Sequence, residues 1–422
     1  MQCDWPPEPK MFRKPISIFS YVYKQTQANF LDLNKQLNKK SGFSQMDKQK
    51  IYFPNLNGLR FIAAFLVIIH HIEQLKSISN LENYWGTIPF IGVIGKLGVV
   101  LFFVLSGFLI TYLLLSEEKS FDDISIKKFY MRRILRIWPL YFLIIILAFF
   151  VLPYINLFTL NGFGINSIHA DLAIKLVLYA LFLPNIVLSM LGVIPYASHT
   201  WSIGTEEQFY LVWPVFMKYL KKNRILLMFI IIVTYLLFRL FLANPLSDFI
   251  PYKNIIREFW STFSIDCMAI GGIFGIMLFR NDRFLYLIKN NLTFYFSLAF
   301  VSILMIKGVY IPYFHLDFFS VFFGIIILNF ASNDKIKISL ENKYFNYLGN
   351  ISYGLYMYHP IGIILAIYLT VAIGHPTNWL IYPLSLLFTI IIAGLSYKYF
   401  ETYFLKFKHK FSKVLSGNST GQ

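Results

Sequence analysis

The chain is a succession of long apolar runs separated by short polar segments. A helix that crosses a bilayer needs roughly 20 apolar residues. Candidate runs can be marked at 57–76, 90–116, 134–153, 172–190, 206–220, 225–243, 264–280, 289–306, 316–331, 347–371 and 377–400. The pattern predicts an all-α polytopic membrane protein, because a soluble chain of this length would divide into domains with polar surfaces.

Basic clusters between the runs predict which ends face the cytoplasm. Lys and Arg are enriched in the cytoplasmic loops of membrane proteins. The clusters at 119–136, 218–224 and 335–343 should therefore lie inside, and the loops 153–170 and 372–378, which carry almost no Lys or Arg, should lie outside. Both termini are then cytoplasmic, so the number of crossings is even.

The region between the third run and the cluster at 218–224 permits only one net crossing. It nevertheless holds two apolar runs, 172–190 and 206–220. We therefore expect a bundle of about ten transmembrane helices, with one of these two runs re-entrant or interfacial. Irregular backbone survives at membrane depth only where it lines a protein or water cavity, so this region is also a candidate wall of an active site.

Composition agrees with a membrane protein and argues against a nucleic-acid-binding one. Of the 422 residues 57% are hydrophobic and 14% are charged, and the net charge is +17. The basic residues lie in the N-terminal arm, the short loops and the tail, where positive charge is expected in a membrane protein. Cys3 and Cys267 suggest neither a disulfide framework nor a metal site. The expected organisation is a polar cytoplasmic extension over 1–50, a membrane-embedded domain over 51–405 and a basic cytoplasmic tail over 406–422.

The first run carries ionisable side chains that hydrocarbon disfavours and that usually mark function. Arg60 lies near one end of the run, and His70, His71 and Glu73 lie near the other. At about 100° per residue, Arg60 and His71 share one helix face, roughly 16 Å apart along the axis, and His70 points away. A long substrate with an anionic end at Arg60 could reach His71, and a histidine suits proton abstraction near neutral pH. Alternatively, both histidines lie at the outer interface and hydrogen-bond to lipid or to neighbouring helices.

Three arginines, Arg132, Arg133 and Arg136, lie near the predicted cytoplasmic entry of the third run. Guanidinium groups bind phosphates in a bidentate manner, but an ordinary cytoplasmic basic cluster explains the same residues. In the second run, Ser106 and Gly107 allow close helix approach or admit a ligand, and packing is the favoured interpretation of this pair taken alone.

The segment TWSIGTEEQFYLVWP places Glu206 and Glu207 at the start of an apolar stretch, five residues after Trp201. A carboxylate at the edge of a cavity could orient a histidine through its second ring nitrogen, although two acids are also simply favourable at a helix N-terminus. Tyr356 and His359 add polar groups at depth, where they could equally satisfy hydrogen bonds within the bundle. No zinc-ligand spacing is visible, so no metal is expected.

These segments resemble the acyltransferase-3 family of integral membrane O-acyltransferases, best known for acetylating bacterial surface polysaccharides. Six stretches in family order carry the resemblance: NLNGLRFIAAFLVIIHH, FFVLSGFLI, FYMRRILRIWPLY, TWSIGTEEQFYLVWP, LGNISYGLYMYHP and SYKYFETYF. They cover residues 55 to 405, nearly the whole chain apart from the N-terminal arm. In the last stretch Tyr403 replaces a proline that commonly follows the glutamate, which argues against a site role for Glu401.

The resemblance implies ten transmembrane helices and an acyltransferase domain over 51–405. It implies acetyl-CoA, or another acyl-CoA, as the cytoplasmic co-substrate, and a carbohydrate hydroxyl as the acceptor. His71 and Glu206 would then be catalytic, with Glu206 as the partner of His71. The coenzyme phosphates would be bound by Arg60, Arg133 and Arg136. Substrate or oxyanion contacts would come from Ser106, Trp201, Tyr356 and His359.

The family further implies the bacterial inner membrane as the location, with the lipid bilayer and the carbohydrate acceptor as partners. His71 would either deprotonate the acceptor hydroxyl or be transiently acylated. Some relatives fuse a soluble esterase-like domain after the last helix, so either the membrane domain completes the transfer or a separate periplasmic or extracellular partner does. The alternative function is a transporter or flippase of lipid-linked sugars, which also uses intramembrane charges and broken helices, although no paired repeat halves are visible. A third alternative is a catalytically silent sensor. The presence of Arg60, His71 and Glu206 argues against it.

Overall fold

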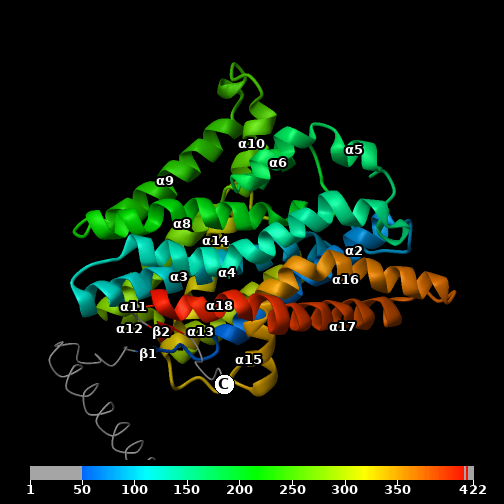
Figure 1. The fold of residues 1–422 in the computed structure, drawn as a ribbon. Coiled ribbons are helices and arrows are strands. Elements are labelled where there is room, and N and C mark those ends of the chain that lie inside the picture. Colours follow the sequence, from blue (N-terminus) through cyan, green and yellow to red (C-terminus); the bar gives the residue numbers. More distant parts are fainter. Residues whose placement is uncertain (1–49, 413–414, 417–422) are drawn as a thin grey trace, which may run out of the picture. The chain divides into compact units, whose positions relative to one another are not determined.

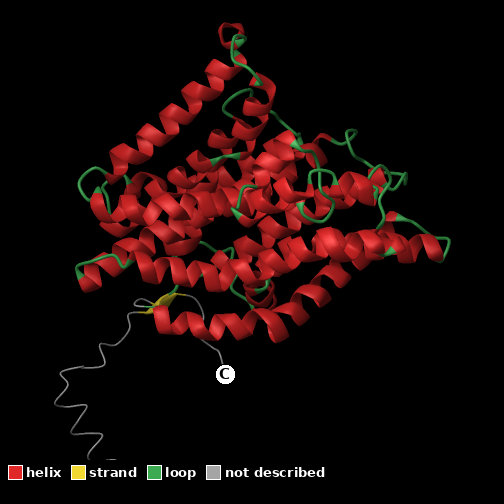
Figure 2. Ribbon diagram, turned by 45° about the horizontal axis from the view of Figure 1, so that its top comes forward, coloured by secondary structure: helices red, strands yellow, loops and turns green. Residues whose placement is uncertain are grey.

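The structure is a computed structural model that describes residues 50–412 and 415–416. Helix makes up most of the described chain, and the two short strands β1 (Lys50–Ile51) and β2 (Leu415–Ser416) pair in parallel (Figure 2). The all-α class is thereby confirmed. The expected N-terminal extension, apart from Lys50, lies outside the described residues, and so do residues 413–414 and 417–422 of the tail.

Figure 1 traces the helices in chain order. The longer helices are α2 (Leu56–Ile78), α3 (Pro89–Phe121), α4 (Ile126–Ile146), α8 (Trp201–Tyr219), α9 (Arg224–Ala243), α11 (Ile265–Arg280), α13 (Asn291–Ile306), α14 (His315–Ser332), α16 (Ser352–Ala372) and α17 (Asn378–Ser396). The shorter ones are α5 (Ile165–His169), α6 (Leu172–Ala180), α7 (Pro184–Met190), α10 (Lys253–Thr262), α12 (Leu285–Ile288), α15 (Lys343–Asn350) and α18 (Thr402–Lys408). The 3-10 turns are η2 (Leu152–Tyr154), η3 (Asn156–Phe158), η4 (Ser198–Thr200), η5 (Pro245–Ser247) and η7 (His409–Phe411), and the π-helical turns are η1 (Leu147–Val151) and η6 (Tyr397–Glu401).

Within the described residues, eight helical segments are long and apolar enough to cross a membrane, which makes the chain an integral membrane protein. They are α2, α3, α4 with its continuation to Tyr154, α9, the segment Lys253–Arg280, α14, α16 and the segment Asn378–Lys408. Helix α13 is apolar but shorter, and α8 is outside this set. The count of about ten crossings stays a prediction.

The run 172–190, which was a candidate re-entrant segment, is broken into α6 and α7. The backbone between them turns through Phe182, which has a φ of 57°. The freed carbonyl oxygen of Phe182 accepts a hydrogen bond of 2.9 Å from Gln208 of α8, as broken backbone at membrane depth requires. A Cβ at Gly204 would lie 2.6 Å from Cδ of Pro184, so α8 approaches the break closely because position 204 is a glycine.

Helix α3 is the central helix and packs most closely on α11. A Cβ at Gly107 would lie 1.9 Å from the carbonyl oxygen of Met268, and a Cβ at Gly271 would lie 2.1 Å from that of Val104. The two backbones therefore touch through a reciprocal pair of glycines. For Gly107 this confirms the packing interpretation and not the ligand interpretation.

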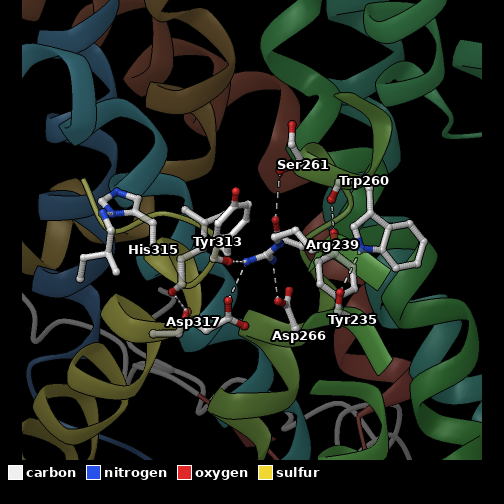
Figure 3. A network of polar contacts seen from close by, with 12 residues as sticks. Tyr235, Arg239, Trp260, Ser261, Asp266, Tyr313, His315 and Asp317 are labelled. Carbon is white, nitrogen blue, oxygen red and sulfur yellow. Dashed lines mark hydrogen bonds and ion pairs between the residues drawn. The ribbon is translucent and has the colours of Figure 1, made fainter. Parts of the chain in front are cut away.

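An ion-pair network joins the three helices α9, α11 and α14. Arg239 of α9 donates a hydrogen bond of 2.8 Å to Asp317 of α14 and one of 3.0 Å to Asp266 of α11. Figure 3 shows dashed lines from the guanidinium to both carboxylates, and the guanidinium carbon lies 5.0 Å from the ring centroid of Tyr235 of α9. Because buried charges persist only when they are paired, this network anchors α9 to the bundle.

Candidate active site

The bundle encloses a cavity of about 330 Å³ between helices from both halves of the chain. This lies at the lower end of the range of roughly 300–1,000 Å³ that small-molecule sites occupy. Polar side chains of the cavity wall come from α2, α3, α4, α8, α16 and the η6–α18 segment and include Arg60, Ser106, Arg133, Arg136, Ser202, Glu206, Tyr210, Tyr353, Tyr356, Glu401 and Lys408. Segments far apart in sequence thus build one site.

Four cations converge on this cavity: Arg60, Arg133, Arg136 and Lys408. Their charges act on one another across the cavity. The guanidinium of Arg60 donates to Oδ1 of Asn57 at 2.8 Å, and the buried Nε of Arg133 has no hydrogen-bond partner. Among the described residues none of the four forms a salt bridge. We refer to this space as the cationic cavity.

Three other arginines of the described chain, Arg132, Arg224 and Arg239, are paired with carboxylates. Arg132, next in sequence to Arg133, contacts Glu117 at 3.1 Å, and Arg224 contacts Glu118 at 2.7 Å. An ordinary cytoplasmic basic cluster would not separate neighbouring arginines in this way. The unpaired cations therefore favour an anionic ligand, and the residues fit the phosphates of a coenzyme.

Glu206 lies on the wall of the cationic cavity. Its carboxylate accepts hydrogen bonds from Ser106 at 3.0 Å and from Tyr210 at 2.8 Å. The ring of Tyr210 also lies 5.5 Å from the guanidinium carbon of Arg133. Glu206 thus fixes two hydroxyl groups beside the cations. Glu207, on the next position, instead accepts a longer bond of 3.3 Å from Trp138 and is not part of the cavity wall.

Tyr356 of α16 and Ser202 of α8 form a further part of the cavity wall. Their hydroxyl oxygens lie 2.7 Å apart, and the Tyr356 hydroxyl donates to the carbonyl oxygen of His199 at 2.7 Å. His359 follows Tyr356 by three residues on α16, and His199 precedes Ser202 by three residues. Both histidines therefore lie directly behind this wall.

His71 belongs to the same group of histidines and does not line the cavity. Its ring centroid lies 4.7 Å from that of His359, and His359 lies 5.0 Å from His199. His70 is 5.1 Å from His71 but turns toward α3, where its Nδ1 lies 2.7 Å from the carbonyl oxygen of Ile91. We call His71, His199 and His359 the imidazole cluster.

The hydrogen bond made by Nδ1 fixes the tautomer of His71. This atom lies 2.9 Å from the carbonyl oxygen of Val67, one turn earlier on α2. A carbonyl oxygen only accepts, so Nδ1 carries the proton and Nε2 keeps its lone pair. The neutral ring is thus presented as a base. The orienting partner of His71 is a main-chain carbonyl, and Glu206, the partner expected from the sequence, bonds elsewhere.

The predicted site residues accordingly fall into two neighbouring groups. Those on the cationic cavity are Arg60, Ser106, Arg133, Arg136, Glu206 and Tyr356. Those outside its wall are His71 and His359, which contact each other, and Trp201, whose ring lies 6.2 Å from that of Phe103. Tyr356 joins the groups, because its carbonyl oxygen lies 2.6 Å from Nδ1 of His359.

His199, Lys408 and Glu401 are among the residues of the site that were missed from the sequence. His199 lay unremarked beside the acidic segment, and Lys408 was counted only as part of the basic tail. Glu401 was discounted because of Tyr403, yet it is buried on the cavity wall and accepts a bond of 3.3 Å from Ser396. The π-helical turn η6 brings Glu401 and Lys408 to the cavity, and nothing in the residue pattern indicated that turn.

Tyr52, which lines the cavity, is held by Glu341 in the loop between α14 and α15. Its carboxylate accepts hydrogen bonds from the Tyr52 hydroxyl, from the Asn55 amide at 2.8 Å and from Asn346 at 2.7 Å. Partial burial alone would raise the pKa of Glu341, but these bonds outweigh it and lower the pKa below its ordinary value. The charged carboxylate thereby ties the start of α2 to that loop.

Within the described residues no group of three or more His, Cys, Asp or Glu side chains is placed to hold a metal ion.

Comparison with known proteins matches the acyltransferase-3 model, described as an acyltransferase domain, to residues 53–398. Relatives include a putative peptidoglycan O-acetyltransferase, YrhL, of Bacillus subtilis, 28% identical over 83% of this chain and 54% of its own length. The peptidoglycan O-acetyltransferase OatA of Listeria monocytogenes is 25% identical over 85% of this chain and 58% of its own. A putative O-acetyltransferase of Staphylococcus aureus, SACOL0978, is 28% identical over 88% of this chain and 60% of its own.

The chain thus spans between 54% and 60% of the length of these relatives. No solved structure matches it. The family model covers most of the chain. It includes the imidazole cluster and the three arginines of the cationic cavity, and it ends before Glu401 and Lys408. The chain therefore belongs to the acyltransferase-3 family.

Proposed function

We propose that this chain is a membrane-bound O-acyltransferase that moves an acetyl group from acetyl-CoA to a hydroxyl of a carbohydrate acceptor. The observation that carries the proposal is the set of unpaired cations on one buried cavity, next to a histidine whose Nε2 is free to act as a base. Transfer from a coenzyme thioester to a hydroxyl needs a site that binds the anionic coenzyme and a base that takes the hydroxyl proton.

Arg60, Arg133 and Arg136 would hold the coenzyme phosphates, with Lys408 adding a fourth positive charge. Guanidinium groups suit this task because they bind phosphate oxygens in pairs. Acetyl-CoA supplies the activated acetyl thioester. The long axis of α2 then leads from Arg60 toward His71, which lie roughly 16 Å apart by the rise of a continuous helix.

His71 would act at the far end of this path. Its Nε2 takes the proton of the acceptor hydroxyl while the hydroxyl oxygen forms a bond to the acetyl carbon and the carbon–sulfur bond breaks. The same nitrogen returns the proton to the departing thiolate, so the products are the acetyl ester and the free thiol. To stabilise the oxyanion that forms in between, Tyr356 of the cavity wall would have to turn its hydroxyl proton away from the carbonyl oxygen of His199.

A carbohydrate acceptor is supported by the relatives, two of which are named for peptidoglycan O-acetylation. The basic clusters support a bacterial inner-membrane location with the cationic cavity opening to the cytoplasm. In this orientation the imidazole cluster lies toward the outer side, where a cell-envelope acceptor would arrive. A separate extracellular partner is compatible with the greater length of the relatives.

The experiment that tests this function is acetyl transfer in proteoliposomes that contain the purified chain. Acetyl-CoA labelled in the acetyl group is supplied with an N-acetylglucosamine tetrasaccharide as the surrogate acceptor. We expect labelled ester to form with the wild-type chain and not with empty liposomes. A chain that carries lipid-linked sugars across the vesicle wall and yields no labelled ester would be a flippase, and the proposal would be wrong.

A further inference from the structure

Two buried histidines of the imidazole cluster each leave a ring nitrogen without a hydrogen-bond partner. His199 is 6% exposed and His359 is fully buried, and Nε2 of each has no partner among the described residues. Buried polar atoms are nearly always hydrogen-bonded. Two such atoms on neighbouring rings therefore indicate that a ligand completes the site.

The hydrogen bonds of the opposite ring nitrogens determine what kind of ligand fits. Nδ1 of His359 lies 2.6 Å from the carbonyl oxygen of Tyr356, so it carries the proton and its Nε2 has a lone pair. Among the described residues no hydrogen bond of the His199 ring fixes its tautomer, so the unpartnered Nε2 of His199 can accept a hydrogen bond. The free Nε2 of His359, like that of His71, needs a hydrogen-bond donor.

The surroundings of these nitrogens select an uncharged donor. Among the described residues no carboxylate and no lysine or arginine forms a salt bridge with the imidazole cluster. Lone pairs repel an anion, and no three of these side chains are placed to hold a metal. A polyhydroxylated molecule is the remaining class that donates several hydrogen bonds without charge.

We propose that His199 and His359 form the acceptor-binding site, in which their Nε2 atoms accept hydrogen bonds from sugar hydroxyls. This inference rests on the proposed acetyl transfer. Because His71 lies next to His359, with ring centroids 4.7 Å apart, a sugar bound in this way presents a further hydroxyl to Nε2 of His71. His199 and His359 bind and position the acceptor, and His71 alone removes the proton.

Asparagine and glutamine substitutions separate the two nitrogens of each ring. His359→Asn keeps a donor near the position of Nδ1, and with it the bond to Tyr356, but removes the acceptor at Nε2. His359→Gln places an amide oxygen near Nε2. The measurement is steady-state acetyl transfer to the N-acetylglucosamine tetrasaccharide, with KM determined separately for the oligosaccharide and for acetyl-CoA.

We expect His359→Asn and His199→Asn to raise the KM for the oligosaccharide about tenfold, the effect of losing one hydrogen bond that leaves its partner unpaired. The KM for acetyl-CoA should stay within about twofold, because the cationic cavity is unchanged. His359→Gln should recover most of the oligosaccharide affinity. The matched control is His315→Asn, a buried histidine of α14 whose ring lies 4.9 Å from that of Tyr310, which should change neither KM.

An unchanged oligosaccharide KM in both asparagine variants would overturn the inference while leaving acetyl transfer intact. The inference would also be overturned if the asparagine and glutamine variants raised the KM for the oligosaccharide and the KM for acetyl-CoA equally, since that pattern indicates a structural role. Loss of transfer on chelation that zinc restores would assign the cluster to a metal instead. Should one variant fail to elute as a folded protein, the other carries the test. A wild-type chain that forms no ester at all refutes the proposed function itself.

Discussion

The hydroxyl of Ser106 donates a hydrogen bond of 3.0 Å to the carboxylate of Glu206, which joins α3 to α8 on the wall of the cationic cavity. The same carboxylate accepts a second bond from Tyr210. Glu206 therefore orients hydroxyl groups beside the arginines, and its negative charge partly offsets theirs. Its place in the site differs from the histidine partner that the sequence suggested.

Glu206→Gln should slow acetyl transfer about tenfold without weakening coenzyme binding. The amide nitrogen of glutamine cannot accept a hydrogen bond, so one of the two hydroxyls loses its acceptor, while the cavity becomes more positive. The measurement is kcat for transfer together with the Kd of CoA. Glu207→Gln, at a position outside the cavity wall, is the control. Weaker CoA binding in Glu206→Gln would contradict this role.

Arg133→Ala should weaken CoA binding about 10- to 100-fold, since a hydrogen bond to a charged group contributes about 1.5–3 kcal/mol. Titration of the detergent-solubilised protein with CoA measures the effect. Lys127→Ala removes one positive charge from an exposed position on the same helix and should leave the Kd unchanged. Equal losses in the two variants would show that net charge alone, and not the cavity, attracts the coenzyme.

Gly107→Ala should destabilise the bundle by about 1–3 kcal/mol, the usual cost of an overpacked core. The added methyl group would lie 1.9 Å from the carbonyl oxygen of Met268 and would force α3 and α11 apart. Thermal unfolding in detergent checks this. Gly92→Ala, on the same helix with no atom within 4 Å of the new Cβ, should be neutral or stabilising. A Tm for Gly107→Ala that matches wild type would refute the close contact.

Arg239→Ala should cost about 3–5 kcal/mol of stability, because it leaves the buried carboxylates of Asp266 and Asp317 without their cation. The comparison is Lys253→Ala, whose partner Asp248 is 72% exposed and whose ion pair should contribute at most about 1 kcal/mol. Unfolding in detergent distinguishes them. Similar losses for both variants would mean that the network in Figure 3 does not anchor α9.

The helical class and most helix positions could be predicted from hydrophobic run length, because a bilayer sets a minimum length for each span. Helix α2 was expected over 57–76 and runs over Leu56–Ile78. The cluster at 132–136 could be predicted as basic, but only the fold separates Arg133, which is unpaired, from Arg132, which Glu117 neutralises. Such pairing depends on contacts between helices that sequence spacing does not encode.

For the glutamates and histidines, too, the sequence could not show which side chains meet across helices. Helical periodicity correctly placed Arg60 and His71 on one helix, but it could not show that Val67, four residues before His71, would occupy Nδ1. Nor could it bring His199 and His359, which are 160 positions apart in sequence, against each other. The π-helical turn that carries Glu401 to the cavity has no signature in residue type.

The central claim is that Nε2 of His71 is the base for acetyl transfer, and His71→Asn tests it most directly. Asparagine keeps a donor for the carbonyl oxygen of Val67 but has no basic nitrogen at the position of Nε2. Single-turnover transfer from labelled acetyl-CoA to the oligosaccharide should fall about 10²- to 10⁴-fold, the usual contribution of general base catalysis, while the Kd of CoA stays at the wild-type value. Transfer at the wild-type rate in a folded His71→Asn protein would contradict the account.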